Sequence, residues 1–250
     1  MCTLVILHRP GHDWPVMIAA NRDEMLDRSW SGPARHWPDR PEVVAGRDHL
    51  AGGSWLGVND HGVAAGILNR VGTLGPSAGK RSRGELVLDA LDHADAADAT
   101  EALAALDGDA YRPFNLVLAD NSGAYWLRHD GSARIARRTV PPGLSMFTAH
   151  DRNSPDSPRV QRHLPRFETA AAPDPAADDW DSWAKLLASK GNYGNGASEQ
   201  AAMCISTPPG FGTVNASLIA LPAAQSLTRR PVWRFAAGPP DEFSFAVIDI

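Results

Sequence analysis

The chain has 250 residues, of which 43% are apolar, and this is enough for one large domain with a substantial core. Its formal charge of −5 excludes the broad basic field of a nucleic-acid-binding protein, and no run of about 18 apolar residues predicts a membrane helix. The N-terminus also lacks the order of residues typical of a secretory signal. We therefore expect one domain over residues 1–250, soluble and cytoplasmic, with no nucleic acid as partner and no stable membrane insertion.

Cysteines and histidines give no sign of a metal. The two cysteines, Cys2 and Cys204, are too few for a disulfide framework. The nine histidines never fall in a ligand spacing such as HExxH. We expect no metal and no resident cofactor.

Cys2 precedes an aliphatic run, residues 3–7, that predicts a buried strand. Removal of Met1 would place an α-amine and a thiol on the same residue. The ordinary pKa of such an amine is about 7.7–8.0 and that of a thiol is about 8.5, so the amine can accept the thiol proton near neutral pH. A cysteine on a buried strand also serves simply as a small apolar residue, and both interpretations stay open.

Residues 14–20 predict a second strand, which the turn-rich residues 9–13 join to the first in a hairpin. The polar residues 21–24 then follow at the end of this strand. Arg22 can lower the pKa of a nearby thiol, and Asp23 can orient a free amine. Four polar residues after a strand are also commonly just its solvated end.

A second predicted hairpin ends at another asparagine. Residues 28–50 are rich in Pro, Gly, Trp and Arg and predict a long ordered loop. Residues 52–58 and 63–68 then predict two strands, after which comes Asn69. An amide at this position can donate to a developing oxyanion, or it can simply stabilise a turn.

The remaining chain predicts a mixed fold. Ser82 and Glu85 match a capping box at the start of one helix, and a second helix covers residues 94–106. Further helices are expected at 158–167 and 178–190, a mobile loop at 190–197, and strands at 111–120, 124–128, 133–140, 144–148, 203–205, 212–221, 232–236 and 243–248. This order favours an α+β fold in which two packed sheets are covered by helices.

Several of these segments carry a family resemblance. They are Met1-Cys-Thr-Leu4, Ala20-Asn-Arg-Asp-Glu24, Gly53-Ser-Trp-Leu-Gly-Val-Asn59, Leu68-Asn-Arg70, Phe211-Gly-Thr213 and Ser217-Leu-Ile-Ala-Leu221. In these motifs the chain resembles the NRDE family, which includes transport and Golgi organisation protein 2. That family is similar to N-terminal nucleophile (Ntn) hydrolases of the choloylglycine hydrolase and penicillin V acylase type. The resemblance implies a four-layer αββα sandwich.

The resemblance also implies roles for individual residues. Cys2 would be the nucleophile, Arg22 and Asp23 would support its thiolate and amine, and Asn69 would donate to the oxyanion. In the acylases the Arg and Asp lie three residues apart, whereas adjacent residues of a regular strand face opposite sides. Either the strand ends or bulges there, or Asn21 and Asp23 form the inward pair.

Two further positions depart from the acylase pattern. A second oxyanion Asn is missing, and the region where it is expected offers Ser145, Thr148 or His150. Val214 stands where an Arg often follows the Gly-Thr step.

The expected function is hydrolysis of a small acyl amide, at a C–N bond other than a peptide bond, through a Cys2 acyl-enzyme. The alternative is a non-catalytic binding or trafficking protein that holds haem or an acyl lipid in the same pocket. In that case His8 or Cys2 could be an axial ligand of haem. A scaffold without a small-molecule role is the third possibility.

Overall fold

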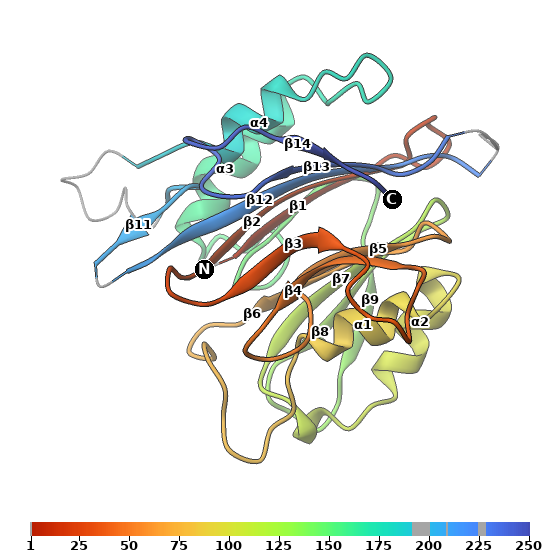
Figure 1. Cartoon of the computed structure of the whole chain (residues 1–250), viewed down its shortest axis with the longest axis vertical. Coiled ribbons are helices and arrows are strands. Elements are labelled where there is room, and N and C mark those ends of the chain that lie inside the picture. Colours follow the sequence, from red (N-terminus) through yellow and green to blue (C-terminus); the bar gives the residue numbers. More distant parts are fainter. Residues whose placement is uncertain (1, 192–200, 209, 225–228) are drawn as a thin grey trace.

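The computed structural model describes residues 2–191, 201–208, 210–224 and 229–250. In this part of the chain two antiparallel sheets pack face to face, and helices cover the outer face of each (Figure 1). The first sheet has the order β10-β1-β2-β12-β13-β14, with β11 paired to β12, and the second has the order β3-β4-β5-β6-β7-β8-β9. This arrangement confirms the predicted α+β fold with four αββα layers.

The first sheet contains β1 (Thr3–His8), β2 (Val16–Met25), β10 (Gly143–Phe147), β11 (Ser206–Thr207), β12 (Phe211–Leu221), β13 (Val232–Ala236) and β14 (Ala246–Ile248). The second contains β3 (Trp30–Ala34), β4 (Val43–Asp48), β5 (Leu56–Asn59), β6 (Ala64–Asn69), β7 (Phe114–Ala119), β8 (Ala124–His129) and β9 (Ala136–Thr139). Helices α3 (Pro158–Thr169) and α4 (Asp181–Leu187) cover the first sheet, and α1 (Glu85–Leu91) and α2 (Ala96–Ala104) cover the second. A short 3-10 turn, η1 (Gly108–Ala110), precedes β7.

The alternation of side chains along β1 explains why this strand is apolar throughout. Leu4 and Ile6 face the second sheet and belong to the core between the sheets. Val5 points the other way, into the core beneath α3 and α4. Because both faces are covered, each of these side chains contributes about 1.5–3 kcal/mol by its burial.

One irregularity in the first sheet matters for the site. The strands β2 and β12 pair with Asp23 opposite Thr213 and Arg22 opposite Asn215, so the register shifts by one residue between Thr213 and Asn215. Val214 is the extra residue of this β-bulge. As a result, Thr213 faces the helices, where it contacts Asp23, while Asn215 faces the second sheet.

Residues 28–50 are not the long loop that the sequence predicted. They contain β3 and β4, which pair with each other at one edge of the second sheet. Val43, Val44 and Ala45 are buried and make β4 an ordinary internal strand. Pro33 lies in β3, where the edge position tolerates its missing N–H.

Several boundaries also differ from the prediction, and three of them have a clear physical basis. The strand β2 continues to Met25 because β12 pairs with it along this length, so residues 21–24 lie within a strand and not after it. The helix α1 begins with Gly84 as its N-cap and has no side-chain cap, because Ser82 instead accepts from the Gly84 amide in a local turn. The strand predicted at 203–205 is β11, displaced to Ser206–Thr207.

The helix predicted at 94–106 is confirmed as α2, with Asp95 accepting from the Asp98 amide as its N-cap. Most of the predicted mobile loop at 190–197 lies outside the described residues. Among the helices in the described ranges, none is long and apolar enough to cross a bilayer.

Candidate active site

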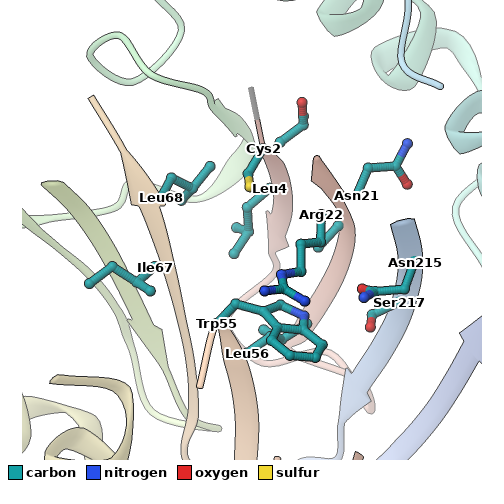
Figure 2. Close-up of a pocket in the computed structure, with 12 residues that line it drawn as sticks. Cys2, Leu4, Asn21, Arg22, Trp55, Leu56, Ile67, Leu68, Asn215 and Ser217 are labelled. Carbon is teal, nitrogen blue, oxygen red and sulfur yellow. The ribbon is translucent and has the colours of Figure 1, made fainter. Parts of the chain in front are cut away.

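Cys2 lines two hollows, which share several lining residues. Figure 2 shows Cys2 among the side chains of the smaller one. The inner pocket, of about 20 Å³, is lined by apolar side chains such as Leu4, Leu56 and Leu68. The main cavity, of about 310 Å³, is lined largely by polar and charged side chains. Cys2, Arg22 and Trp55 line both, so a molecule in the main cavity can reach the sulfur.

The register of three neighbouring strands aligns Cys2 with Arg22 and Asn215. Thr3 pairs with Asn21 across β1 and β2, which puts Cys2 beside Arg22, and Arg22 pairs with Asn215 across β2 and β12. All three side chains line the inner pocket on the face turned toward the second sheet. The Cys2 thiol donates to the backbone oxygen of Asp23 at 3.5 Å.

Arg22 is held by two side chains of the second sheet. Its Nη2 donates to Asp48 Oδ2 at 2.8 Å, and its guanidinium carbon lies 4.0 Å from the centroid of the Trp55 ring. Gly46 makes room for that ring, because a Cβ there would lie 2.3 Å from it. The buried Nη1 has no hydrogen-bond partner among the described residues. Burial lowers the pKa of Arg22, while the charges of Cys2 and Asp48 act to raise it.

Asp48 stands between two arginines at the end of β4. Its Oδ2 also accepts from Arg28 at 2.7 Å, and its Oδ1 accepts from the amides of Leu50 and Ala51. Burial raises the pKa of Asp48, but these hydrogen bonds outweigh burial and leave the pKa lowered overall. Asp48 was not predicted from the sequence, because the strand that carries it was interpreted as a loop.

The environment of Cys2 has opposing effects on its thiol. Burial is the largest and raises the pKa of Cys2, whereas the nearby Arg22 guanidinium lowers it. The net direction is upward. Formation of the thiolate at neutral pH therefore depends on a base that accepts the proton.

Asp23 lies on the opposite face of β2, beneath α3. Its Oδ2 accepts from Arg159 Nη1 at 2.9 Å, and its Oδ1 accepts from Thr213 Oγ1 at 2.7 Å. The same Arg159 nitrogen donates to Thr3 Oγ1 at 2.6 Å. The structure therefore does not bring the Asp23 carboxylate to the face that carries the Cys2 sulfur. It links Asp23 to Thr3, the residue after Cys2, through an arginine that no sequence motif indicated.

Asn21 also faces the helices, and it serves as a structural link. Its Nδ2 donates to the backbone oxygens of Leu187 and Met203, each at 3.0 Å. The inward pair is therefore not Asn21 with Asp23. The strand β2 neither ends nor bulges at this point, and Arg22 is the residue that faces the cavity.

Two amides adjoin the reactive thiol. Asn69 ends β6, as predicted, and lines the main cavity with Cys2, and its side chain makes no hydrogen bond to a described residue. Asn215 Nδ2 is buried and likewise without a partner in the described chain. The sequence reasoning missed Asn215, although Asn215 and Ser217 interrupt an otherwise apolar strand on the same face.

The residues considered as a second oxyanion donor lie elsewhere. Thr148 Oγ1 contacts Ser157 Oγ at 3.2 Å, and Ser145 accepts from Arg152 at 3.2 Å. Neither these two nor His150 is among the described residues that line the two hollows. His8 is also absent from that lining, and its Nδ1 contacts Val140 O at 3.2 Å. Within the described chain, no cluster of three or more His, Cys, Asp or Glu residues could hold a metal.

Solved structures show where this fold has been seen before. The chain is similar to an N-acylethanolamine-hydrolyzing acid amidase ortholog from Caenorhabditis elegans, with a TM-score of 0.53, 11% identity, and coverage of 99% of this chain and 100% of that one. It is similar to penicillin V acylase from Agrobacterium tumefaciens, with a TM-score of 0.51, 15% identity, and coverage of 94% and 83%. A variant of conjugated bile acid hydrolase from Clostridium perfringens gives a TM-score of 0.52 at 10% identity, with coverage of 100% and 97%. These neighbours establish the Ntn hydrolase fold.

Sequence comparison identifies the family. The chain is 34% identical over 114 residues to the Transport and Golgi organization protein 2 homolog of Homo sapiens, and 36% identical over 115 residues to that of Bos taurus. These matches span only 40% and 39% of the two relatives. The profile of the family described as Transport and Golgi organisation 2 matches residues 1–227. The chain therefore belongs to the Transport and Golgi organisation 2 family and has the fold of an Ntn hydrolase.

Proposed function

We propose that the chain is an N-terminal-cysteine amidohydrolase that cleaves a small acyl amide. The observation that supports this most directly is the row formed by Cys2, Arg22 and Asn215, all of which line the inner pocket. This row brings together a thiol, a guanidinium group and an amide NH2 that has no hydrogen-bond partner among the described residues. Asn69 adds a second amide from the facing sheet.

The reaction follows from these groups once Met1 has been removed. The α-amine of Cys2 accepts the thiol proton, and the sulfur forms a bond to the carbonyl carbon of the amide. The Nδ2 groups of Asn69 and Asn215 donate to the oxyanion of the tetrahedral intermediate. The α-ammonium group then returns the proton to the leaving amine as the C–N bond breaks. Water attacks the resulting thioester, with the amine as base, and releases the acid and the free thiol.

Arg22 favours the thiolate in this scheme. Asp48 and Trp55 hold its guanidinium in place, so its positive charge stays in the pocket that Cys2 lines. Asp23 acts indirectly, because its contact with Arg159 restrains Thr3 and hence the backbone next to Cys2.

The first experiment measures the intact mass of the purified protein, which reports whether Met1 has been removed. Hydrolysis is then assayed on an N-acylethanolamine, penicillin V and a glycine-conjugated bile acid, the amide types suggested by the names of the structural neighbours. Turnover should disappear in Cys2→Ala and persist in Cys204→Ser, whose thiol lies outside both hollows. Full hydrolysis by Cys2→Ala would exclude the proposed mechanism.

The two amides are tested separately. Asn69→Ala and Asn215→Ala should each lower kcat by about 10²-fold or more, the effect typical of one lost oxyanion donor. Asn121→Ala, in the exposed turn after β7, is the matched control and should leave kcat unchanged. If the three variants behave alike, the amides do not stabilise the oxyanion.

The raised pKa of Cys2 and the apolar side chains of Leu50, Trp55 and Ile67 in the main cavity favour a second candidate function. In this function the cavity binds an acyl lipid or haem without turnover. The Cys2 thiol then stays neutral, because burial of a neutral thiol costs less free energy than burial of a thiolate. An absorbance titration with haemin, comparing wild type with Cys2→Ala, distinguishes this function. A spectral change that depends on Cys2, in a protein without hydrolytic activity, would support it over the amidohydrolase.

A further inference from the structure

Most of the charged side chains that line the main cavity are cations. The charged side chains that line the cavity are Arg22, Glu24, Arg28, Asp48, Lys80, Arg81, Arg83 and Arg112. Of the two carboxylates among them, Asp48 binds Arg22 and Arg28, and Glu24 lies 3.7 Å from Arg28. Arg81 pairs with Glu85 at 2.8 Å. In the described part of the chain, Lys80, Arg83 and Arg112 form no ion pair with a carboxylate.

Arg83 and Arg112 are bound only by neutral groups. Arg112 donates to the backbone oxygens of residues 72 and 74–76. Arg83 donates to Thr73 Oγ1 and Pro113 O, each at 3.0 Å. Within the described chain, neither guanidinium has a carboxylate within 4.0 Å. Carbonyl and hydroxyl oxygens orient these groups but leave both positive charges in place.

The two guanidinium groups also repel each other. Burial, and after it the charge of Arg112, lower the pKa of Arg83 to about 10. The charges of a Cys2 thiolate and of Glu24 act in the opposite direction and raise it. An anion bound between the two arginines would relieve this repulsion.

The chemistry of the wall and the size of the cavity restrict the ligand. Guanidinium groups bind planar carboxylates in bidentate geometry, and two of them can hold one carboxylate from both sides. The volume of about 310 Å³ lies at the lower limit for ligand pockets, so the ligand is small. The inner pocket, at about 20 Å³, has room for little more than a water molecule, so most of the ligand must occupy the basic cavity.

We propose that the main cavity binds small amides that carry a carboxylate, such as N-acyl amino acids, with the carboxylate between Arg83 and Arg112 and the scissile carbonyl at Cys2. The identity of the reacting bond rests on the proposed function. The carboxylate site does not, because binding at the two arginines requires no turnover.

The first test compares two thiol reagents of nearly equal size, the anionic iodoacetate and the neutral iodoacetamide. The ratio of their alkylation rates at Cys2 is measured by intact mass, in a Cys204→Ser background, with N-acetylcysteine as the reference thiol. A cationic cavity should raise the ratio by about tenfold over the reference at low salt, and 0.5 M NaCl should reduce it. Arg83→Gln and Arg112→Gln should each lower the ratio at least about threefold.

Matched controls separate local charge from a general effect. Arg137→Gln removes the same charge from the exposed strand β9, outside the cavity, and should keep the wild-type ratio. Arg83→Lys should retain most of the effect, and thermal unfolding identifies any variant that fails to fold. A wild-type ratio equal to that of N-acetylcysteine, or one insensitive to both Gln variants, overturns the proposal.

The second test uses protection of Cys2 from iodoacetamide by unreactive probes. N-acetylglycine at 50 mM should slow alkylation at least threefold, and the neutral N-acetylglycinamide should not. Equal protection by the two, or no protection by N-acetylglycine, overturns the proposal. Stronger protection by the phosphonate analogue, N-acetylaminomethylphosphonate, would overturn the carboxylate proposal and indicate that the site prefers a phosphate-like anion. Because all probes are read without turnover, an inactive enzyme that still selects the carboxylate refutes only the amidohydrolase function.

Discussion

The guanidinium carbon of Arg22 lies 4.0 Å from the centroid of the Trp55 ring, so a cation of the first sheet is held by an aromatic side chain of the second. Asp48, also from the second sheet, binds the same guanidinium at 2.8 Å. A charge that lowers the pKa of Cys2 is therefore positioned by residues outside the strand that carries it. Any change in how the sheets pack should alter the reactivity of the thiol.

Replacement of Arg22 should shift the pH dependence of Cys2 alkylation. Arg22 lowers the pKa of the thiol, so in Arg22→Gln the pKa rises and less thiolate exists at a given pH. The iodoacetamide rate at pH 7.5 should fall by at least about threefold, and the rates should converge at high pH. Arg22→Lys should recover part of the rate, and Arg137→Gln should match wild type. A rate loss that is equal at every pH would instead indicate a steric effect.

Loss of Asp48 should destabilise the protein strongly. Asp48→Asn leaves Arg22 and Arg28 without their shared carboxylate, and removal of one partner from a buried pair typically costs about 3–5 kcal/mol. The control is Asp13→Asn, which breaks the exposed pair with Arg229 and should cost at most about 1 kcal/mol. Urea unfolding measures both free energies, and similar losses would show that the Asp48 pairs behave as surface contacts.

Gly46 and Trp55 should be energetically coupled. A methyl group at Gly46 would lie 2.3 Å from the Trp55 ring, so Gly46→Ala should cost about 1–3 kcal/mol by overpacking. In the Trp55→Leu background the same substitution should cost much less, because the ring that it meets is gone. A double-mutant cycle by urea unfolding measures this coupling, and additive losses would contradict the proposed contact.

His163 should make stability depend on pH. Burial lowers the pKa of His163 to about 4, and its Nε2 contacts Ala201 O at 2.8 Å. The unfolded state therefore takes up a proton near pH 6.5, before the folded state does. The neutral form stabilises the fold fully above about pH 6.5, and this contribution, about 3 kcal/mol, is lost as the pH falls toward 4.

Unfolding free energies of wild type and His163→Gln, measured between pH 4.5 and 7.5, test this effect. The variant should lose less stability on acidification than wild type. His61→Gln, at an exposed position, should follow the wild-type curve. Parallel curves for all three proteins would show that His163 does not titrate as described.

The sequence was sufficient for the layers of the fold and for part of the site. Apolar strands such as 212–221 and the amphipathic helix at 94–106 follow local rules, and the motif residues Cys2, Arg22 and Asn69 do meet at one cavity. The interpretation of residues 28–50 as a loop was wrong because their Pro and Gly content concealed an edge strand and its partner.

The rest of the site depends on tertiary contacts that local patterns do not encode. Asp48 and Arg159 lie 26 and 136 residues from the side chains they bind in β2. Asn215 was not predicted because it lies in a mostly apolar strand, which the sequence pattern assigns to the core. The chemical roles of Cys2, Arg22, Asp23 and Asn69 stay predictions until the variants above are measured.

The bulge at Val214 makes this residue dispensable for the contacts on either side of it. Thr213 and Asn215 lie two residues apart, so in a regular strand that kept Val214 they would share one face. The bulge turns them to opposite faces, opposite Asp23 and Arg22. Deletion of Val214 would make them adjacent residues of a regular strand, which also face opposite sides, so a homologous chain can lack this residue and still place the hydroxyl and the amide as they are placed here.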